Sequence, residues 1–306
     1  MDNRLKTRGI YVEIPIRASL DEVWNHTQQP SLHEQWDLRF TRIQYLPKLD
    51  EADPQRFLYS TRLGFGLKIS GQGESLAIRS NSDGEATSSL KFWSDQPISL
   101  IRAGSGYWKY IPAGNVVRFI TWYDYQVRFG PAGRLFDRLV FRPLIGWATA
   151  WSFDVLRIWL EQGIPPKRSR RGGLINLTAR CSLAAVWVYQ GLAPKLLFPD
   201  SGELAIMKAA GILPGAEPVL LAAFGIGEIL FGIAFLLPWF GKSLHILNLL
   251  LLSILGLGAL LTQPEIFIAP FNPAALTLAM WALSLIALLN LDDLPSAGRC
   301  LRKALA

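Results

Sequence analysis

Glu228 is a carboxylate near the middle of an apolar run that spans residues 218–239. A charge at the centre of a membrane costs about 2.5–3.5 kcal/mol on insertion scales, so we expect Glu228 to face other helices and to be paired or protonated. Tyr189, Gln190 and the long side chain of Lys195 reach a similar depth from an earlier apolar segment. The sequence therefore predicts a polar cluster of these four residues, which either fixes helix packing or forms a proton or ligand site.

His26 and His33 are the other side chains suited to acid–base chemistry, and they lie near Glu34 and Asp37. Such catalysis needs a titratable group inside a cavity. We expect both histidines at the surface or in helix packing, and strand alternation aims Asp124 outward. The chain has no Ser-His-Asp order with a nucleophile elbow, no HExxH and no phosphate loop. No catalytic residue is predicted.

The two cysteines, Cys181 and Cys300, are far apart and lack the spacing of a metal site or a redox pair. We expect both to be free thiols without a catalytic role. The chain also has no flavin, haem or iron–sulfur motif, so we expect no metal and no cofactor of its own.

Charge divides the chain into two parts. Residues 1–171 carry 24 Lys/Arg and 17 Asp/Glu, a net of +7, whereas residues 172–306 carry seven of each. The basic excess is spread over predicted strands without a recognition motif, so we expect no nucleic-acid partner. The densest basic cluster, within the linker 164–173, is typical of a topology signal that contacts anionic lipid head groups. The N-terminus has no apolar core of a cleaved signal peptide.

Residues 1–163 have the pattern of a mixed helix and sheet domain. Alternation predicts a strand over 9–17, and two capping boxes, Ser19 to Glu22 and Ser31 to Glu34, predict two short helices. Further strands are predicted over 41–46, 56–62, 66–78, 85–93, 98–110 and 115–129. A helix follows, to about residue 162, with apolar residues at a 3.6-residue spacing. An antiparallel sheet with one buried face fits this pattern.

This element order resembles the helix-grip (SRPBCC) superfamily, which includes START lipid-transfer domains and polyketide cyclase-like proteins. The resemblance covers about residues 8–162, with YVEIPIRASLDEVWNHTQQPSLHEQWD at the head and FDRLVFRPLIGWATAWSFDVLRIWLE at the tail. It implies an α+β helix-grip fold, in which the antiparallel sheet wraps round the long C-terminal helix and a hydrophobic ligand lies between them. The candidates to line that space are Phe119, Tyr123, Tyr125, Trp147 and Trp151. Core packing explains aromatic residues at this spacing as well.

Residues 174–292 are expected to form an all-α bundle of four transmembrane helices, over 174–198, 218–237, 244–262 and 271–291. With the N-terminus inside, nine Lys/Arg fall on the inner side and only Lys195 and Lys208 on the outer side. We therefore expect a multi-pass protein of the plasma (inner) membrane, with the N-terminal domain and the tail 293–306 in the cytoplasm.

Three runs in this region, WVYQGLAPKLLF, FGIGEILFGIAFLL and APFNPAALTLAMWALSL, resemble the DoxX-like family. Gln190 stands where relatives often have His. The resemblance implies a compact four-helix membrane domain, and relatives include a subunit of a thiosulfate:quinone oxidoreductase.

Two functions are open at this point. The first is a membrane-anchored protein that binds or presents a hydrophobic small molecule or lipid, with the bilayer as its second partner. The alternative is a subunit of a quinone-linked membrane oxidoreductase complex, in which a membrane redox partner supplies the redox chemistry. A cyclase or dehydratase-type enzyme would need a titratable group in the cavity, which strand alternation does not supply.

Overall fold

The computed structural model describes residues 9–304, except 49, 51–52, 65, 80–83, 210, 212, 238–240, 263, 269, 271 and 292. The chain divides into two compact units. The first consists of Met1–Ser169 together with Pro295–Ala306, and the second of Arg170–Leu294. The first unit is therefore built from both ends of the chain, and the second is inserted between them.

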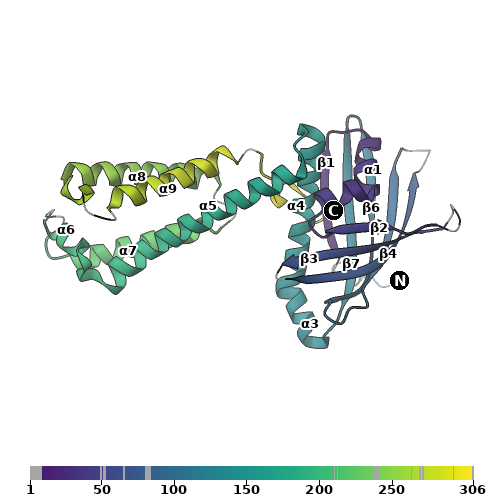
Figure 1. The fold of residues 1–306 in the computed structure, drawn as a ribbon, viewed down its shortest axis with the longest axis horizontal. Coiled ribbons are helices and arrows are strands. Elements are labelled where there is room, and N and C mark those ends of the chain that lie inside the picture. The colour runs from purple at the N-terminus through teal and green to yellow at the C-terminus, as the bar shows by residue number, and fades with distance from the viewer. Residues whose placement is uncertain are drawn as a thin grey trace. The chain divides into compact units, whose positions relative to one another are not determined.

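A seven-stranded antiparallel sheet forms the body of the first unit (Figure 1). Its spatial order is β1-β7-β6-β5-β4-β3-β2, so every strand after β1 pairs with its neighbour in sequence and β7 closes back onto β1. The strands are β1 (Ile10–Ile16), β2 (Arg42–Tyr45), β3 (Gln55–Gly64), β4 (Leu67–Arg79), β5 (Ala86–Trp93), β6 (Ile101–Ala113) and β7 (Val116–Val127). These strands agree with the alternating segments of the sequence.

Two short helices, α1 (Leu20–Gln28) and α2 (Pro30–Trp36), join β1 to β2. The capping box predicted at the start of α1 is confirmed, because Ser19 and Glu22 satisfy each other's backbone amides. The capping box predicted at Ser31 is wrong. The second helix has its N-cap at Gln29, two residues earlier, and begins at Pro30 without a side-chain cap, since the fixed φ of proline suits a first helical turn.

The long helix of this unit follows β7 in three joined pieces: α3 (Gly130–Phe136), the π-helical turn η1 (Asp137–Phe141) and α4 (Arg142–Gln162). Helix α4 packs along the sheet beside β1, in a helix-grip arrangement (Figure 1). The core lies between them, where Phe119 of β7 stacks on Phe153 of α4 with 4.4 Å between ring centroids. Both rings are fully buried.

The C-terminal residues 295–304 pack in the first unit. Leu301 exchanges two backbone hydrogen bonds with Glu13 of β1, at 3.0 and 2.9 Å. The short turn η5 (Ala297–Arg299) contacts α4, and the buried Cys300 thiol donates to the carbonyl of Ala150 at 3.2 Å. This part of the predicted tail therefore completes the sheet and its covering helix.

Every secondary-structure element described in the second unit is a helix, and the first of them begins just before the unit does. Its elements are α5 (Pro166–Leu192), η2 (Ala193–Leu197), η3 (Pro199–Ser201), α6 (Glu203–Ala209), α7 (Glu217–Ala234), α8 (Lys242–Thr262), η4 (Pro264–Ile268) and α9 (Pro273–Leu289). The segment described from sequence as a linker, 164–173, is helical from Pro166 onward. Helices α5 and α7 approach closely at Gly191 and Gly225, where any added Cβ would meet the backbone of the facing helix.

Helices α7 and α8 are long and apolar enough to cross a membrane, and less than a quarter of either span is buried. The core helix of a soluble protein would be mostly buried, so this exposure favours contact with lipid. Helix α9 is apolar but shorter, at 17 residues. Asn272 caps it by accepting a hydrogen bond from the amide of Ala275, and Pro273 is its first residue.

Candidate functional site

Aromatic rings line the inner face of the sheet because glycines on the neighbouring strands leave room for them. The ring of Phe57 lies over Gly73, and the ring of Phe92 lies over Gly104. A Cβ at either glycine would come within 2.3 Å of the ring. Phe57 and Gly73 are direct cross-strand partners on β3 and β4, and Phe92 and Gly104 are partners on β5 and β6. The result is an aromatic lining that continues through Tyr123, whose ring centroid is 6.5 Å from that of Phe92.

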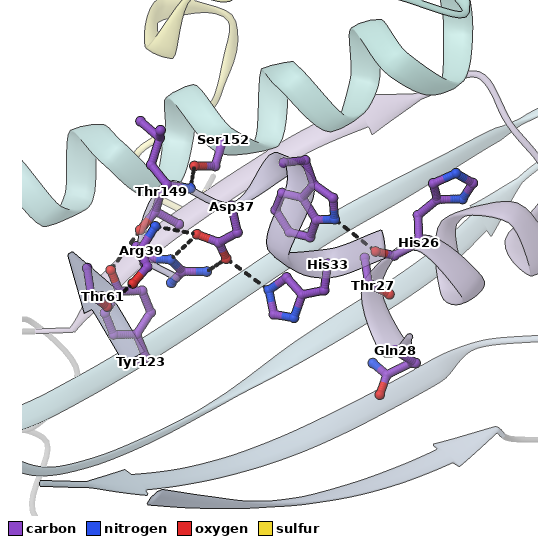
Figure 2. Close-up of polar contacts among 12 residues, drawn as sticks. His26, Thr27, Gln28, His33, Asp37, Arg39, Thr61, Tyr123, Thr149 and Ser152 are labelled. Carbon is purple, nitrogen blue, oxygen red and sulfur yellow. Dashed lines mark hydrogen bonds and ion pairs between the residues drawn. The ribbon is translucent and has the colours of Figure 1, made fainter. Parts of the chain in front are cut away.

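A charged cluster borders this lining. Asp37 follows α2 and lies between His33 and Arg39 (Figure 2). Its carboxylate accepts hydrogen bonds from Arg39 Nε at 2.9 Å and Nη2 at 2.6 Å, and it bonds to His33 Nε2 at 3.0 Å. The Asp37 side chain is fully buried, whereas the Arg39 side chain is 13% exposed. The two-point contact fixes the plane of the guanidinium.

The surrounding elements hold the cluster in place. The carbonyl of Arg39 accepts a hydrogen bond from the hydroxyl of Thr61 on β3, and the amide of Leu38 donates to Ser152 on α4 at 2.9 Å. Tyr123 shares a 2.8 Å hydrogen bond with Thr149 of α4 (Figure 2). The loop after α2 is thereby tied to the sheet and to the long helix.

Electrostatics keep both members of the pair charged. Burial by itself raises the pKa of Asp37, but the adjacent Arg39 charge and the hydrogen bonds from His33 and Arg39 outweigh it and hold that pKa well below its usual range. Burial likewise lowers the pKa of Arg39, and the Asp37 charge more than restores it, so that the pKa is raised. The site thus holds a permanent cation whose charge Asp37 partly neutralises.

Arg39 lies against the aromatic lining on two sides. Its guanidinium carbon is 5.4 Å from the ring centroid of Tyr123 and 5.6 Å from that of Phe40. Phe40 in turn meets Tyr59 at 5.6 Å. A cation fixed beside aromatic rings suits a ligand with an apolar body and an anionic or carbonyl oxygen, because the rings take the body and the guanidinium takes the oxygen.

The five predicted lining residues lie in three different environments. Tyr123 and Tyr125 are buried on the inner face, where Tyr125 donates to Asp137 at 2.7 Å and lies 4.5 Å below Arg142. Phe119 belongs to the same packed core as these two tyrosines. Trp151 is half-buried beside that core, whereas Trp147 lies on the outer surface with 46% of its area exposed. Trp147 therefore does not line the inner face.

The sequence analysis missed Arg39 and gave His33 and Asp37 no functional role. Charged residues such as Asp and Arg in a loop are normally exposed to solvent, so the sequence alone offered no reason to expect that this pair is buried. The one available signal was the aromatic residue on either side of the loop, Trp36 and Phe40. Trp36 is fully buried and stacks on His33 at 5.0 Å.

Two hollows of about 380 and 330 Å³ open on the other face of the sheet. The first is lined mainly by outward-facing polar residues of β2 to β4, among them Arg42, Ser60 and Lys68. The second borders the stacked pair Tyr107 and Trp122. Neither lining includes Arg39.

In the second unit, two of the four predicted cluster residues meet directly. Lys195 Nζ lies 2.9 Å from a carboxylate oxygen of Glu228 and 2.9 Å from one of Glu203. Gln190 contributes its backbone carbonyl, 3.4 Å from Lys195, and Tyr189 is exposed. The cluster is therefore one lysine between two carboxylates, and Glu203 is the member that the sequence analysis did not include.

A second polar chain links three helices of this unit. Trp187 of α5 donates to Asn248 of α8 at 2.7 Å, and Asn248 donates to Ser284 of α9 at 2.7 Å. His245 lies 3.4 Å from Ser284. Asn248 and Ser284 are fully buried and bonded across helices, so this polar chain helps to hold α5, α8 and α9 together.

Across the described ranges, no group of three or more His, Cys, Asp or Glu side chains is placed to hold a metal ion. Cys181 and Cys300 are both free thiols.

Comparison with known proteins relates both parts of the chain to others. Residues 184–285 match the model of the DoxX-like family. The chain is 44% identical over 230 residues to the uncharacterized membrane protein YndG of Bacillus subtilis (strain 168), covering 72% of this chain and 85% of that protein.

Solved structures resemble about half of the chain. One is a STAR-related lipid transfer protein fragment from Xanthomonas axonopodis, 17% identical, covering 50% of this chain and 85% of that chain at a TM-score of 0.39. Another is the Zhui aromatase/cyclase from Streptomyces sp. R1128, 11% identical, covering 45% and 87% at a TM-score of 0.36.

Proposed function

Because this membrane protein belongs to the family of the uncharacterized membrane protein YndG of Bacillus subtilis, we propose that it is a membrane-anchored binding protein. Its helix-grip unit binds an amphipathic small molecule or lipid, with the apolar body on the inner face of the sheet and an anionic or carbonyl group at Arg39. The second unit anchors this binding unit to the bilayer and accepts or presents the ligand.

One observation carries the proposal: the fixed guanidinium of Arg39 lies against the same aromatic rings that line the sheet. The Arg39 side chain retains 13% of its exposure. Farther along the inner face, Phe92 and Leu90 are also only half-buried. This partial exposure supports access of a ligand to the lining.

A bilayer is the natural source of such a ligand. Exposing the apolar surface of a molecule to water costs about 25 cal/mol per Å². A binding unit held beside lipid shortens the exposed step, since the molecule leaves one apolar surface for another. Membrane anchoring and an aromatic binding face therefore belong to one function.

The proposed membrane arrangement has four helices and both termini in the cytoplasm. The first unit contains both ends of the chain, so the second unit has to begin and end on the same side of the membrane. An even number of crossings follows. Helices α7 and α8 supply two, and we propose that α5 and α9 supply the other two. The Lys and Arg residues in the first turns of α5 support a cytoplasmic location at the plasma membrane.

Binding of a fluorescent fatty acid and of its methyl ester to the full chain in lipid nanodiscs tests the proposal. The two probes have the same apolar body, and only the acid offers a carboxylate to Arg39. We expect saturable binding of both, with the acid about 10-fold tighter, as suits one charge-assisted hydrogen bond of ~1.5 kcal/mol. Equal affinities would show that Arg39 does not select a carboxylate over an ester carbonyl. Absence of saturable binding for both probes would contradict the proposed function as a whole.

The alternative, a subunit of a quinone-linked oxidoreductase complex, stays a prediction from resemblance. An assay of quinone reduction by the purified protein with candidate electron donors tests this alternative directly.

A further inference from the structure

A continuous apolar surface lies on the outside of the long helical segment that follows β7. Seven large apolar residues between positions 129 and 147 are each 46–66% exposed. They are Phe129, Leu135, Phe136, Leu139, Val140, Leu144 and Trp147. Isolated exposed apolar residues are ordinary, but a contiguous set on one helical segment marks an interaction site.

Helical spacing separates this surface from the binding face. The residues that turn toward the sheet are Gly133, Asp137, Ile145 and Thr149, which are buried or packed against the core. From Leu135 to Trp147 the exposed residues recur three or four positions apart (135 and 139, 136 and 140, 140 and 144, 144 and 147), so they occupy the opposite side of α3, η1 and the first turns of α4. Phe129 immediately precedes α3. The surface therefore does not belong to the ligand site on the inner face.

The charges of the segment complement an anionic surface. Arg134 and Arg138 are exposed beside the apolar residues. The only acidic residue from 129 to 147 is Asp137. It is buried and turned inward, where it accepts hydrogen bonds from Tyr125 at 2.7 Å and Arg142 at 3.0 Å. The outer side thus presents apolar residues and positive charge without a carboxylate.

The backbone before α3 also favours exposure of an aromatic ring. Phe129 has φ 68° and ψ 26°, in the left-handed region that a residue other than glycine occupies at a cost of about 1–2 kcal/mol. The residue is 58% exposed instead of being packed in the core. A strained residue that turns a phenyl ring outward agrees with a contact made by that ring.

We propose that this surface, residues 129–147, inserts into the head-group region of an anionic bilayer and so forms a second membrane contact of the protein, made by its first unit. An amphipathic helix with apolar residues on one side and arginines at the flank has the chemistry of such a contact. Each arginine near an anionic surface adds about 1 kcal/mol. Because the chain is already anchored in a membrane, the bilayer is the partner present at the highest local concentration.

Lipid quenching of a label on the surface tests this contact in the full chain. We replace Leu139 with Cys in a Cys181→Ser background, attach an environment-sensitive fluorophore, and reconstitute the protein in vesicles of phosphatidylcholine and phosphatidylglycerol with brominated acyl chains. The matched control carries the label at Ile78 of β4, which is comparably exposed at 58%. Both sites are on the surface, so neither substitution should unfold the protein.

We expect brominated lipid to quench the label at position 139 at least about two-fold more than the label at position 78. Reversing Arg134 and Arg138 to Glu should abolish that difference, and so should vesicles of phosphatidylcholine alone in high salt. Equal quenching at the two positions would overturn the proposal. So would a label at 139 that is shielded from aqueous iodide but not quenched by the lipid. In that case a protein surface covers it, and dependence of the shielding on protein concentration would identify a second copy of this chain.

This test is independent of ligand binding. A chain that binds no amphiphile would still show the lipid contact, and a chain without the lipid contact would still bind the fatty acid.

Discussion

The carboxylate of Asp154, in the middle of α4, accepts a hydrogen bond from Arg299 at 2.8 Å, although Arg299 lies 145 residues later in the chain. Asp154 is fully buried and also accepts from the amide of Ser296 at 2.7 Å and from Arg157 Nε at 2.7 Å. One carboxylate therefore holds the C-terminal segment on the long helix, after the chain has passed through the whole second unit.

Loss of this contact should release the segment and expose Cys300. Burial raises the pKa of the Cys300 thiol to about 12, so only about one part in ten thousand is thiolate at pH 8 and the thiol reacts slowly. In a Cys181→Ser background, Asp154→Asn should raise the rate of maleimide labelling at Cys300 by at least about 10-fold. Glu265→Gln, in the second unit, serves as the control. An unchanged labelling rate for Asp154→Asn would show that the segment is held without Asp154.

The path of the chain also predicts topology. Reporters fused before Met1 and after Ala306 should fall on the same side of the membrane, because both ends belong to one unit. The positive-inside rule puts that side in the cytoplasm. A reporter inserted after Gly215, in the loop before α7, should fall on the opposite side. Opposite locations for the two termini would contradict the proposed arrangement.

Asp37 should make the first unit sensitive to acid. Its pKa is held below the ordinary value of about 3.9, so its contribution to stability is present above that ordinary value and is lost as the pH falls toward the lowered one. Asp37→Asn leaves Arg39 buried without its counter-charge and should destabilise the unit by about 3–5 kcal/mol. Thermal unfolding followed by near-ultraviolet circular dichroism measures both effects.

The control for this prediction is Asp95→Asn, at an exposed carboxylate. Between about pH 5 and pH 3, the apparent Tm of the Asp37→Asn protein should fall less than that of the wild type and of Asp95→Asn. Parallel curves for all three proteins would mean that the Asp37 carboxylate contributes no acid sensitivity.

In the second unit, loss of Lys195 should reduce the amount of folded protein more than loss of either carboxylate beside it. Lys195→Met leaves Glu203 and Glu228 without the cation that each meets at 2.9 Å, and an unpaired charge in this setting is costly. The amount of protein in the membrane should fall several-fold. Adding Glu228→Gln should restore most of it, and the exposed Lys208→Met is the control. A Lys195→Met protein at normal levels would show that the cluster does not support folding.

Local patterns predicted much of the fold. Seven strands follow from period-two alternation between turn residues, and the long helix follows from its apolar spacing, because both signals depend only on neighbours in sequence. The exposed position of Trp147 could not be predicted from these local patterns. The helix that carries it is apolar on two opposite sides, one facing the sheet and one exposed, so its spacing alone could not tell which side is buried.

Local sequence patterns could not predict the charged part of the candidate site. Arg39 and Asp37 acquire their role from Tyr123, Thr149 and Ser152, which are 84 to 115 residues away in sequence. The return of residues 295–304 to α4 likewise depends on Asp154, a long-range contact without a local signal. Within the membrane cluster, the pairing of Lys195 with Glu228 followed from helix depth, whereas Glu203 lies in a short helix, α6, that the sequence analysis did not include.

The most direct test of ligand binding is native mass spectrometry of the full chain released from detergent, comparing two tryptophan variants. Leu90→Trp fills the half-buried inner face beside Phe92, and Ser89→Trp adds the same side chain on the outer face of β5. The account predicts that the wild type and Ser89→Trp retain an amphipathic molecule at about one per chain, and that Leu90→Trp retains none. Equal retention by both variants, or none by the wild type after purification from whole membranes, would contradict it.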